Sequence, residues 1–324
     1  MEKGINQLVH TCLKIKNSDK VVIVTDNKTR HISEKIREKI EEITNNIEFF
    51  VLEDFGKRPL KKLPEDIKNS LKNANISLYA AASVEGELAA VRKPLLELVF
   101  NRIKHAHLPN FNEEMIKTGM ATDHRKVQEI TDRLFSLLKK ARKITVTTEK
   151  GTKLEAEFDK KYKWAKSNAI LAEKEWTNLP GAEVFGYPDS ISGVVVIDDT
   201  LGDFFVKYGN LEKSPVFIYI KDNKVIKVEC KDKSLEKELK HELSKKNANI
   251  VGEFAFGTNI FLKKSIGVLL QDEKMPTIHI AFGDPYPKLT NAPYESDVHI
   301  DAVMKNALVF IDGKKILENG HYFL

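Results

Sequence analysis

Cysteine is scarce in this chain of 324 residues, which has only Cys12 and Cys230, far apart in the sequence. Two isolated cysteines exclude a disulfide framework and a cysteine-type zinc site, and they are typical of a protein from a reducing cytoplasm. No apolar run approaches the roughly 18 residues that a membrane-spanning helix needs. The N-terminus also lacks the apolar core and small-residue cleavage site of a secretion signal. We therefore expect a cytoplasmic protein that does not enter a membrane.

An excess of charge of one sign is missing as well. The chain has 52 Lys and Arg against 47 Asp and Glu, a formal net charge of +5 with neutral histidines. Such a small excess over this length predicts no nucleic-acid partner. Neither G-x-G-x-x-G nor G-x-x-x-x-G-K-[ST] occurs, and the G-x-S-x-G of many serine hydrolases is absent. A dinucleotide or ATP site of the usual kind and a nucleophile elbow are therefore not expected.

The first third of the chain alternates between strand and helix patterns. Short apolar runs rich in β-branched residues are typical of buried parallel strands, and they occur at 21–25, 47–52, 76–82 and 103–108. Segments with helical periodicity or a helix-starting proline separate them, at 31–44, 64–72 and 85–100. This alternation predicts an open parallel sheet with helices on both faces, an α/β domain of residues 1–115.

Beyond residue 110 the pattern changes. A long amphipathic helix is predicted at 124–142, and a shorter one at 234–245. Strand pairs around short turns follow, namely 143–148 with 154–158, 216–221 with 225–230, and 308–311 with 315–317. The fold class is therefore α/β overall, with a second, α+β domain of residues 116–324 built on a mixed or antiparallel sheet.

Polar residues that interrupt apolar strands are the best candidates for chemistry. His279 interrupts one apolar strand, while His299 and Asp301 lie two residues apart and so share a face of another. Glu253 lies in an aromatic context, and Glu183 follows a Pro-Gly turn. A carboxylate in an apolar strand is costly unless it is paired or bound to a metal. Histidine and carboxylate side chains of this kind predict a metal centre in the second domain.

Two other histidine patterns are weaker. His241-Glu242 precedes Leu-Ser-Lys-Lys, so the metalloprotease pattern H-E-x-x-H lacks its second histidine. We interpret His241 as an exposed helix residue. His105 and His107 share a strand face but have no evident acidic partner, so we interpret them as polar residues at a strand end.

Four motifs of the second half occur in a characteristic order. They are Asn-Leu-Pro-x-x-Glu-Val-Phe, Gly-Glu-x-x-x-Gly-Thr-Asn, Asp-Glu-Lys before Thr-Ile-His-Ile-Ala-Phe-Gly, and His-Ile-Asp. Together they resemble the thermophilic metallo-aminopeptidases of the aminopeptidase T and aminopeptidase S type, peptidase family M29. The chain would be a short member, and the resemblance runs from about residue 127 to the C-terminus. The first 110 residues match only as a generic α/β domain.

The resemblance implies a metal-dependent aminopeptidase that removes N-terminal residues from peptide substrates by means of a water activated by two metals. It implies two divalent metal ions, Zn, Co or Mn, and a homodimer. Carried over by motif, the ligands fall on Glu183, Glu253, His279, Tyr286, His299 and Asp301. Catalytic roles are expected for Glu253, as ligand or as base, and for Tyr286.

One departure from the family leaves alternatives open. The segment 284–298, which should help to form the wall of the substrate pocket, is compact. The superfamily is also similar to ring-cleaving dihydroxypyridine dioxygenases, in which one Fe(II) would bind His279, His299 and Asp301. The short chain favours this alternative, whereas the three further ligand candidates disfavour it. A third hypothesis, a non-catalytic scaffold or binding protein, predicts that Glu253→Gln changes neither metal content nor activity.

Overall fold

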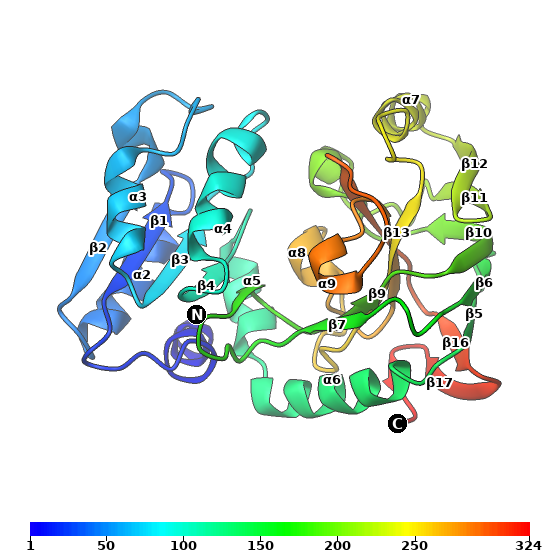
Figure 1. Ribbon diagram of the computed structural model, residues 1–324, viewed down its shortest axis with the longest axis horizontal. Coiled ribbons are helices and arrows are strands. Elements are labelled where there is room, and N and C mark those ends of the chain that lie inside the picture. The colour runs from blue at the N-terminus through cyan, green and yellow to red at the C-terminus, as the bar shows by residue number, and fades with distance from the viewer. The chain divides into compact units, whose positions relative to one another are not determined.

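The computed structural model describes residues 1–324, which form two compact units (Figure 1). Unit 1 comprises Met1–Lys126 and Asn168–Gly181, and unit 2 comprises Val127–Ser167 and Ala182–Leu324. The domain limits expected from the sequence, 1–115 and 116–324, stay a prediction that separate expression of the two segments would test. None of the helices combines the length and the apolar character needed to cross a bilayer.

Unit 1 contains an open sheet whose five strands are all parallel. In spatial order the strands are β2 (Ile47–Val51), β1 (Val21–Thr25), β3 (Ile76–Ala80), β4 (Lys104–His107) and β8 (Trp176–Asn178). The strands β1 and β3 are buried along their whole length, as expected for a sheet covered on both faces. The predicted parallel sheet is confirmed, with β8 as an additional strand from the returning segment.

Short helices surround this sheet. They are α1 (Glu2–Asn6), the π-helical η1 (Gln7–Cys12), α2 (Arg30–Glu41), η2 (Leu52–Phe55), α3 (Glu65–Lys72), the π-helical η3 (Leu88–Arg92), α4 (Lys93–Val99), α5 (Glu113–Lys117) and η4 (Gly119–Ala121). The helix predicted at 85–100 is divided into η3 and α4. Pro94 lies near the start of α4, which follows η3 without a break in the helical stretch, and a π-helical turn of this kind is typical of local irregularities within helices.

A buried ion-pair network closes the carboxyl ends of β1 and β3. Arg58 forms ion pairs with Asp26, directly after β1, and with Glu87. The carboxylate of Asp26 also accepts a hydrogen bond of 2.7 Å from the amide of Ala82. In parallel sheets ligands often bind where neighbouring connections diverge. In unit 1 the side chains of this network occupy that position between β1 and β3.

Unit 2 contains two antiparallel sheets. The larger one has the order β12 (Lys224–Cys230), β11 (Val216–Lys221), β10 (Ser190–Ile197), β6 (Lys153–Glu157), β5 (Lys143–Thr147), β16 (Leu308–Ile311), β17 (Lys314–Glu318) and β18 (His321–Tyr322). All three predicted hairpins occur in it. Asp312 and Gly313 have positive φ angles of 48° and 81°, as a tight Asp-Gly hairpin turn requires. The predicted α/β fold class with an antiparallel second part is confirmed.

The smaller sheet, which we call sheet C, has the order β15 (His299–Val303), β14 (Ile278–Gly283), β13 (Val251–Gly257), β9 (Glu183–Gly186) and β7 (Trp164–Ser167). Side chains from both sheets of unit 2 belong to one apolar core, which includes Ile144 and Ile218 from the larger sheet and Phe254 and Ile280 from sheet C. The remaining helices are α6 (His124–Leu138), η5 (Asp203–Tyr208), α7 (Lys233–Leu243), α8 (Leu269–Asp272) and α9 (Pro287–Thr290).

Candidate metal centre

Five of the six predicted ligands lie on strands of sheet C. Glu183 begins β9, Glu253 lies on β13, His279 on β14, and His299 and Asp301 on β15. Ala281 of β14 is opposite both Glu253 and Asp301 in the antiparallel register. Residues directly opposite each other point to the same face of a sheet. Strands far apart in sequence therefore bring these side chains to one face, which we call the site face.

A β-bulge determines the direction in which Glu253 points. Val251 pairs with Phe282, and both belong to the apolar core. Glu253 pairs with Ala281 on the site face, because the register shifts between Val251 and Glu253. The extra residue is Gly252, at which a Cβ atom would lie only 2.4 Å from the carbonyl oxygen of Gly283. The bulge thus turns Glu253 out of the core and toward the other candidate ligands.

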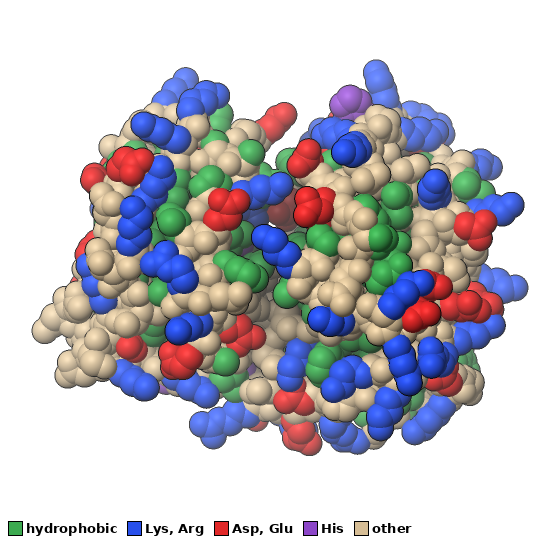
Figure 2. Space-filling model, viewed as in Figure 1, with side chains coloured by type: hydrophobic (Ala, Val, Ile, Leu, Met, Phe, Trp, Pro, Cys, Tyr) green, Lys and Arg blue, Asp and Glu red, His purple; other side chains and the backbone are tan.

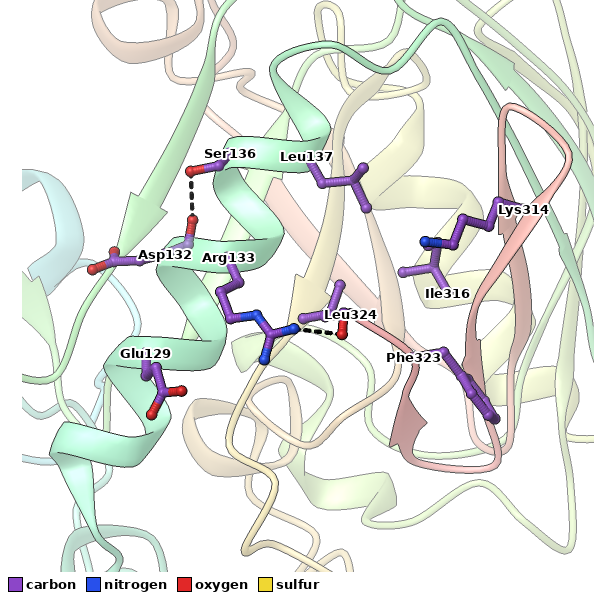
Figure 3. A pocket seen from close by; sticks show the side chains of 9 residues that line it. All are labelled: Glu129, Asp132, Arg133, Ser136, Leu137, Lys314, Ile316, Phe323 and Leu324. Carbon is purple, nitrogen blue, oxygen red and sulfur yellow. Dashed lines mark hydrogen bonds between the residues drawn. The ribbon is translucent and has the colours of Figure 1, made fainter.

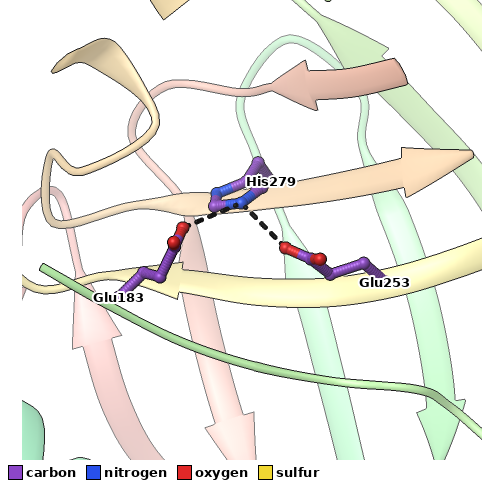
Figure 4. A group of neighbouring side chains, drawn as sticks. All are labelled: Glu183, Glu253 and His279. Atoms are coloured by element: carbon purple, nitrogen blue, oxygen red, sulfur yellow. Dashed lines mark ion pairs between the residues drawn. The ribbon is translucent and has the colours of Figure 1, made fainter. Parts of the chain in front are cut away.

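The imidazole of His279 lies at the centre of the cluster. Its Nε2 atom is 3.3 Å from Glu253 Oε1, 3.6 Å from Glu183 Oε2 and 3.9 Å from Asp301 Oδ1. Figure 4 shows the carboxylates of Glu183 and Glu253 flanking this nitrogen atom. The second histidine, His299, has its Nε2 atom 3.2 Å from Asp301 Oδ1 and 3.9 Å from Glu253 Oε2. The structure therefore brings all five residues together.

Tyr286 is the sixth predicted residue, and it precedes α9. It has the left-handed φ angle of 51°, which is uncommon for a residue with a Cβ atom. Its ring centroid lies 4.7 Å from that of His299 and 5.9 Å from that of Phe185. Burial, together with the negative charges of Glu253 and Asp301, raises the pKa of the Tyr286 phenol well above its usual value. The phenol is therefore protonated in the cluster as it stands.

The neighbouring carboxylates raise the pKa values of both imidazoles. Burial alone would lower the pKa of His279, but Glu253, Asp301 and Glu183 raise it to about 9. Burial is likewise outweighed at His299, where Asp301 and Glu253 raise the pKa to about 10. In turn the imidazoles overcome burial at Asp301 and lower its pKa to about 2. Burial dominates at Glu253 and raises the pKa of its carboxyl group. Without a metal, protons on the imidazoles neutralise part of the acidic charge.

Two further residues of the site had no role in the sequence-based prediction, although they belong to the Asp-Glu-Lys motif. Glu273 and Lys274 follow α8, and both are buried. The ammonium group of Lys274 forms ion pairs of 2.6 Å with Glu183 Oε1 and with Glu273 Oε1. Gly257 lets this segment approach, because a Cβ atom there would lie 1.9 Å from the carbonyl oxygen of Met275. The motif lies between strongly apolar segments of the sequence, and this context could have indicated that Glu273 and Lys274 are buried.

The cluster has the donors and the spacing of a metal site. Carboxylate oxygen and imidazole nitrogen suit Zn²⁺, Co²⁺, Mn²⁺ and Fe²⁺. With metal–ligand bonds of about 2.0–2.2 Å, two donors on one tetrahedral ion lie roughly 3.4 Å apart, close to the distances around His279 and His299. Three groups of donor atoms lie within 4.8 Å of one another: Glu183, Glu253 and His279; Glu253, His299 and Asp301; Glu273, His279 and Asp301. These residues therefore fit a divalent ion.

The histidines also present the required nitrogen atoms. The Nδ1 atom of His299 lies 2.8 Å from the backbone oxygen of Asp284. An N–H donor at Nδ1 fixes the ring and directs Nε2 toward Asp301, the arrangement usual for a metal-binding histidine. The Nδ1 atom of His279 is buried without a hydrogen-bond partner, and its Nε2 atom faces the carboxylates.

A family model described as thermophilic metalloprotease (M29) matches residues 113–320. The chain belongs to this metalloprotease family. The match includes all six predicted ligands and confirms both the resemblance seen in the motifs and the enzyme class, a metallopeptidase that is a hydrolase. Membership of the M29 family also implies that a divalent metal ion is the cofactor.

Two solved structures show the fold that this M29 chain shares. One is wild-type AmpT from Thermus thermophilus, with 17% identity, complete coverage of both chains and a TM-score of 0.75. The other is 2,5-dihydroxypyridine dioxygenase from Pseudomonas putida KT2440, with 12% identity, coverage of 98% of this chain and 96% of that chain, and a TM-score of 0.68. No curated protein sequence matches the chain. The two structures confirm the fold class.

The weaker histidine patterns have structural roles. His105 Nδ1 is 2.7 Å from Ser77 Oγ, and His105 Nε2 is 3.2 Å from His107 Nδ1. Burial lowers the pKa of His105 to about 3, and neither ring belongs to a group of potential metal ligands. His241 is exposed on α7, as expected for a helix surface residue.

A groove in unit 2 lies apart from the metal centre. Figure 3 shows it beside α6 and the C-terminal residues. Arg133 on α6 donates a hydrogen bond to the backbone oxygen of Leu324 there. None of the predicted ligands lines this groove. On the face shown in Figure 2, acidic and basic side chains are interspersed.

Proposed function

We propose that this chain is a metal-dependent aminopeptidase that hydrolyses N-terminal residues from peptides. The observation that supports the proposal is the convergence of two imidazoles and three carboxylates on the site face, in a chain of the M29 family. Glu183, Glu253, His279, His299 and Asp301 would hold Zn²⁺, Co²⁺ or Mn²⁺, with Tyr286 as a further ligand. When bound, a divalent ion supplies a water of lowered pKa and a Lewis acid for the scissile carbonyl group.

Side chains of this centre would share the remaining work. Glu253 lies 3.3 Å from His279 Nε2 and 3.9 Å from His299 Nε2, so its carboxylate would be in position to accept the proton of the activated water as a general base. Tyr286 would act in one of two ways: as a further ligand of the ion, or, where it does not bind the ion, as a protonated phenol that donates a hydrogen bond to a substrate oxygen. The excess of buried carboxylates would attract a free α-ammonium group. Only a chain end offers that group, which accounts for exopeptidase action.

The finer parts of the proposal rest on the family resemblance. It implies two ions, a homodimer and a cytoplasmic location. Both cysteines are free and buried, which agrees with a reducing compartment.

A second candidate function is ring cleavage by a single Fe(II). His299 and His279 lie 3.2 and 3.9 Å from the same oxygen of Asp301, and two histidines with one carboxylate are typical of non-haem iron oxygenases. The fold is also similar to that of the Pseudomonas putida dioxygenase. The additional carboxylates of the cluster favour the peptidase.

Loading the metal-free chain with each ion in turn tests both candidates. We expect Zn²⁺, Co²⁺ or Mn²⁺ to give release of N-terminal residues from short peptides, and no release when the α-amine is acetylated. Glu253→Gln should abolish the activity, whereas Glu155→Gln, on an exposed position of β6, should keep it. Absence of turnover with every loaded ion would exclude the peptidase. Consumption of a dihydroxypyridine and O₂ with Fe²⁺ would support the alternative.

A further inference from the structure

The two carboxylate oxygens of Glu183 face different partners. Oε1 lies 2.6 Å from the ammonium group of Lys274, whereas Oε2 lies 3.6 Å from His279 Nε2. The second distance is close to the roughly 3.4 Å that separates two donors on one tetrahedral ion. The ammonium group therefore occupies one oxygen of this predicted ligand and leaves the other oxygen directed toward the imidazole.

Lys274 is itself held firmly in place. Its side chain is only 1% exposed, and its ammonium group also lies 2.6 Å from Glu273 Oε1. A buried ammonium group is costly unless acidic partners compensate its charge. The two carboxylates therefore keep it between them, and a lysine confined in this way is a fixed point from which Glu183 can be oriented.

The backbones of the two residues are joined by the segment that follows β13. The amide of Thr258 donates a hydrogen bond of 2.8 Å to the carbonyl oxygen of Ala182, directly before Glu183. The amide of Asn259 donates one of 2.8 Å to the carbonyl oxygen of Lys274. Both donor residues are completely buried. The Gly-Thr-Asn motif thus fixes the separation between Glu183 and Lys274 independently of their side chains.

We propose that Lys274 is a positioning residue, which holds Oε1 of Glu183 so that this carboxylate binds a divalent ion through Oε2 alone. Partners of this kind orient metal ligands, and their loss typically lowers metal affinity by about 10–100-fold. The inference rests on the metal dependence in the proposed function and adds a residue beyond the six predicted ligands. It concerns only the ion that Glu183 binds, so it holds for one ion or for two.

The charge of Lys274 alone predicts the opposite effect. A positive charge beside a metal site repels a dication and weakens its binding. Loss of Lys274 should therefore lower the metal affinity if the lysine orients Glu183, and raise it if the lysine acts only through its charge. The sign of the change distinguishes the two roles.

Another buried lysine provides a matched control. Lys104 of β4 lies in unit 1, where it forms an ion pair of 2.9 Å with Glu173 and donates a hydrogen bond of 3.2 Å to the backbone oxygen of Leu13. It is buried as Lys274 is, but its partner Glu173 belongs to no group of potential metal ligands. Substitution of Lys104 therefore reproduces the loss of a buried ammonium group without affecting the centre.

Cobalt binding tests the inference without any substrate. The metal-free full chain is titrated with Co²⁺, followed by the visible absorption of the bound ion, for the natural sequence, Lys274→Met, Glu183→Gln and the double variant. We expect Lys274→Met to weaken, by about 10–100-fold, the same Co²⁺ ion that Glu183→Gln weakens. In a chain that already has Glu183→Gln it should change the affinity little, because both residues act through one carboxylate. Lys104→Met should bind Co²⁺ as the natural chain does.

Three results would overturn the inference. They are an unchanged or higher Co²⁺ affinity in folded Lys274→Met, an equal loss of affinity with and without Glu183→Gln, and a similar loss in Lys104→Met. If Lys274→Met does not fold, a crystal structure of the natural chain loaded with Co²⁺ decides. Glu183 should then bind the ion through one oxygen and keep the other on the ammonium group, whereas binding through both oxygens contradicts the inference.

The outcome is separable from that of the proposed function. The expected Co²⁺ affinities in a chain that cleaves no peptide leave the role of Lys274 intact and reject the aminopeptidase. Peptide cleavage by a chain whose Co²⁺ affinity does not depend on Lys274 does the reverse. A natural chain that binds no Co²⁺ and cleaves no peptide rejects both.

Discussion

Binding of a divalent ion to this centre should release about two protons per chain at pH 7. In the metal-free cluster the pKa of His279 is about 9 and that of His299 about 10, so about 99% or more of each imidazole is protonated at pH 7. A metal needs the lone pair of Nε2, and both protons must therefore leave. Metal affinity should consequently depend steeply on pH.

The size of the effect follows from the two pKa values. Removal of a proton costs about 2.7 kcal/mol when the pKa of the group lies 2 units above the pH, and about 4.1 kcal/mol when it lies 3 units above. The two deprotonation costs together oppose metal binding by at most roughly 7 kcal/mol at pH 7. The affinity should therefore rise by up to about 100-fold per pH unit between pH 7 and 9, and level off above pH 10.

Calorimetric titration of the metal-free chain with Co²⁺, in buffers of different ionisation enthalpy, measures the released protons directly. His299→Gln should release about one proton fewer than the natural chain. A heat of binding that is the same in every buffer would refute the reasoning, because it would mean that the imidazoles are neutral before the metal binds.

The same pKa values affect the stability of the metal-free protein. Both imidazoles have a raised pKa in the folded state, compared with about 6.5 in an unfolded chain. Their contribution to stability is therefore fully present below about pH 6.5 and is lost as the pH rises through 9 and 10. Thermal unfolding in the presence of a chelator should show a lower midpoint at pH 10 than at pH 6.5.

Three substitutions extend these expectations. Glu253→Gln should lower peptide hydrolysis by at least about 100-fold, the usual contribution of a general base, as kcat measurements on the metal-loaded enzyme will check. Gly252→Ala would bring a Cβ atom to 2.4 Å from a backbone oxygen of β14. It should cost about 1–3 kcal/mol and weaken Co²⁺ binding. Gly267→Ala strains the backbone at a φ angle of 74°, but its Cβ meets nothing within 4 Å, so it should lower stability and keep the Co²⁺ affinity. Arg58→Met should lower the free energy of unfolding by about 3–5 kcal/mol, because it leaves two buried carboxylates of unit 1 without their partner. Denaturant titration measures this loss, and the Co²⁺ count should stay unchanged.

The sequence predicts those elements whose signals are local. The apolar run at 21–25 coincides with β1, because a strand buried on both faces needs apolar residues at every position. The Asp312-Gly313 turn identifies the last large hairpin, since few other residues adopt positive φ angles readily. The candidate ligands could also be found, because a charged residue within an apolar strand conflicts with its surroundings.

Features that depend on distant pairing could not be predicted. The strand β8 (Trp176–Asn178) joins the parallel sheet of unit 1 beside β4, although about 70 residues separate the two strands in sequence. A strand of three residues has no periodic pattern that could indicate its pairing partner. Lys274 presents a different difficulty, because lysine is almost always exposed and its sequence neighbours do not reveal the two carboxylates that compensate its charge.

Glu253 illustrates how a tertiary feature can reverse a local pattern. Strict alternation along β13 would place Val251 and Glu253 on the same face, so either a valine would enter the polar site or a carboxylate would enter the core. The bulge at Gly252 resolves this conflict, because Val251 then pairs with Phe282 on the core side and Glu253 with Ala281 on the site face. Only glycine fits, since a Cβ atom would meet the backbone of β14. The irregular pairing of β13 is therefore the structural condition for bringing this carboxylate to the histidines, and a regular strand would have lost it.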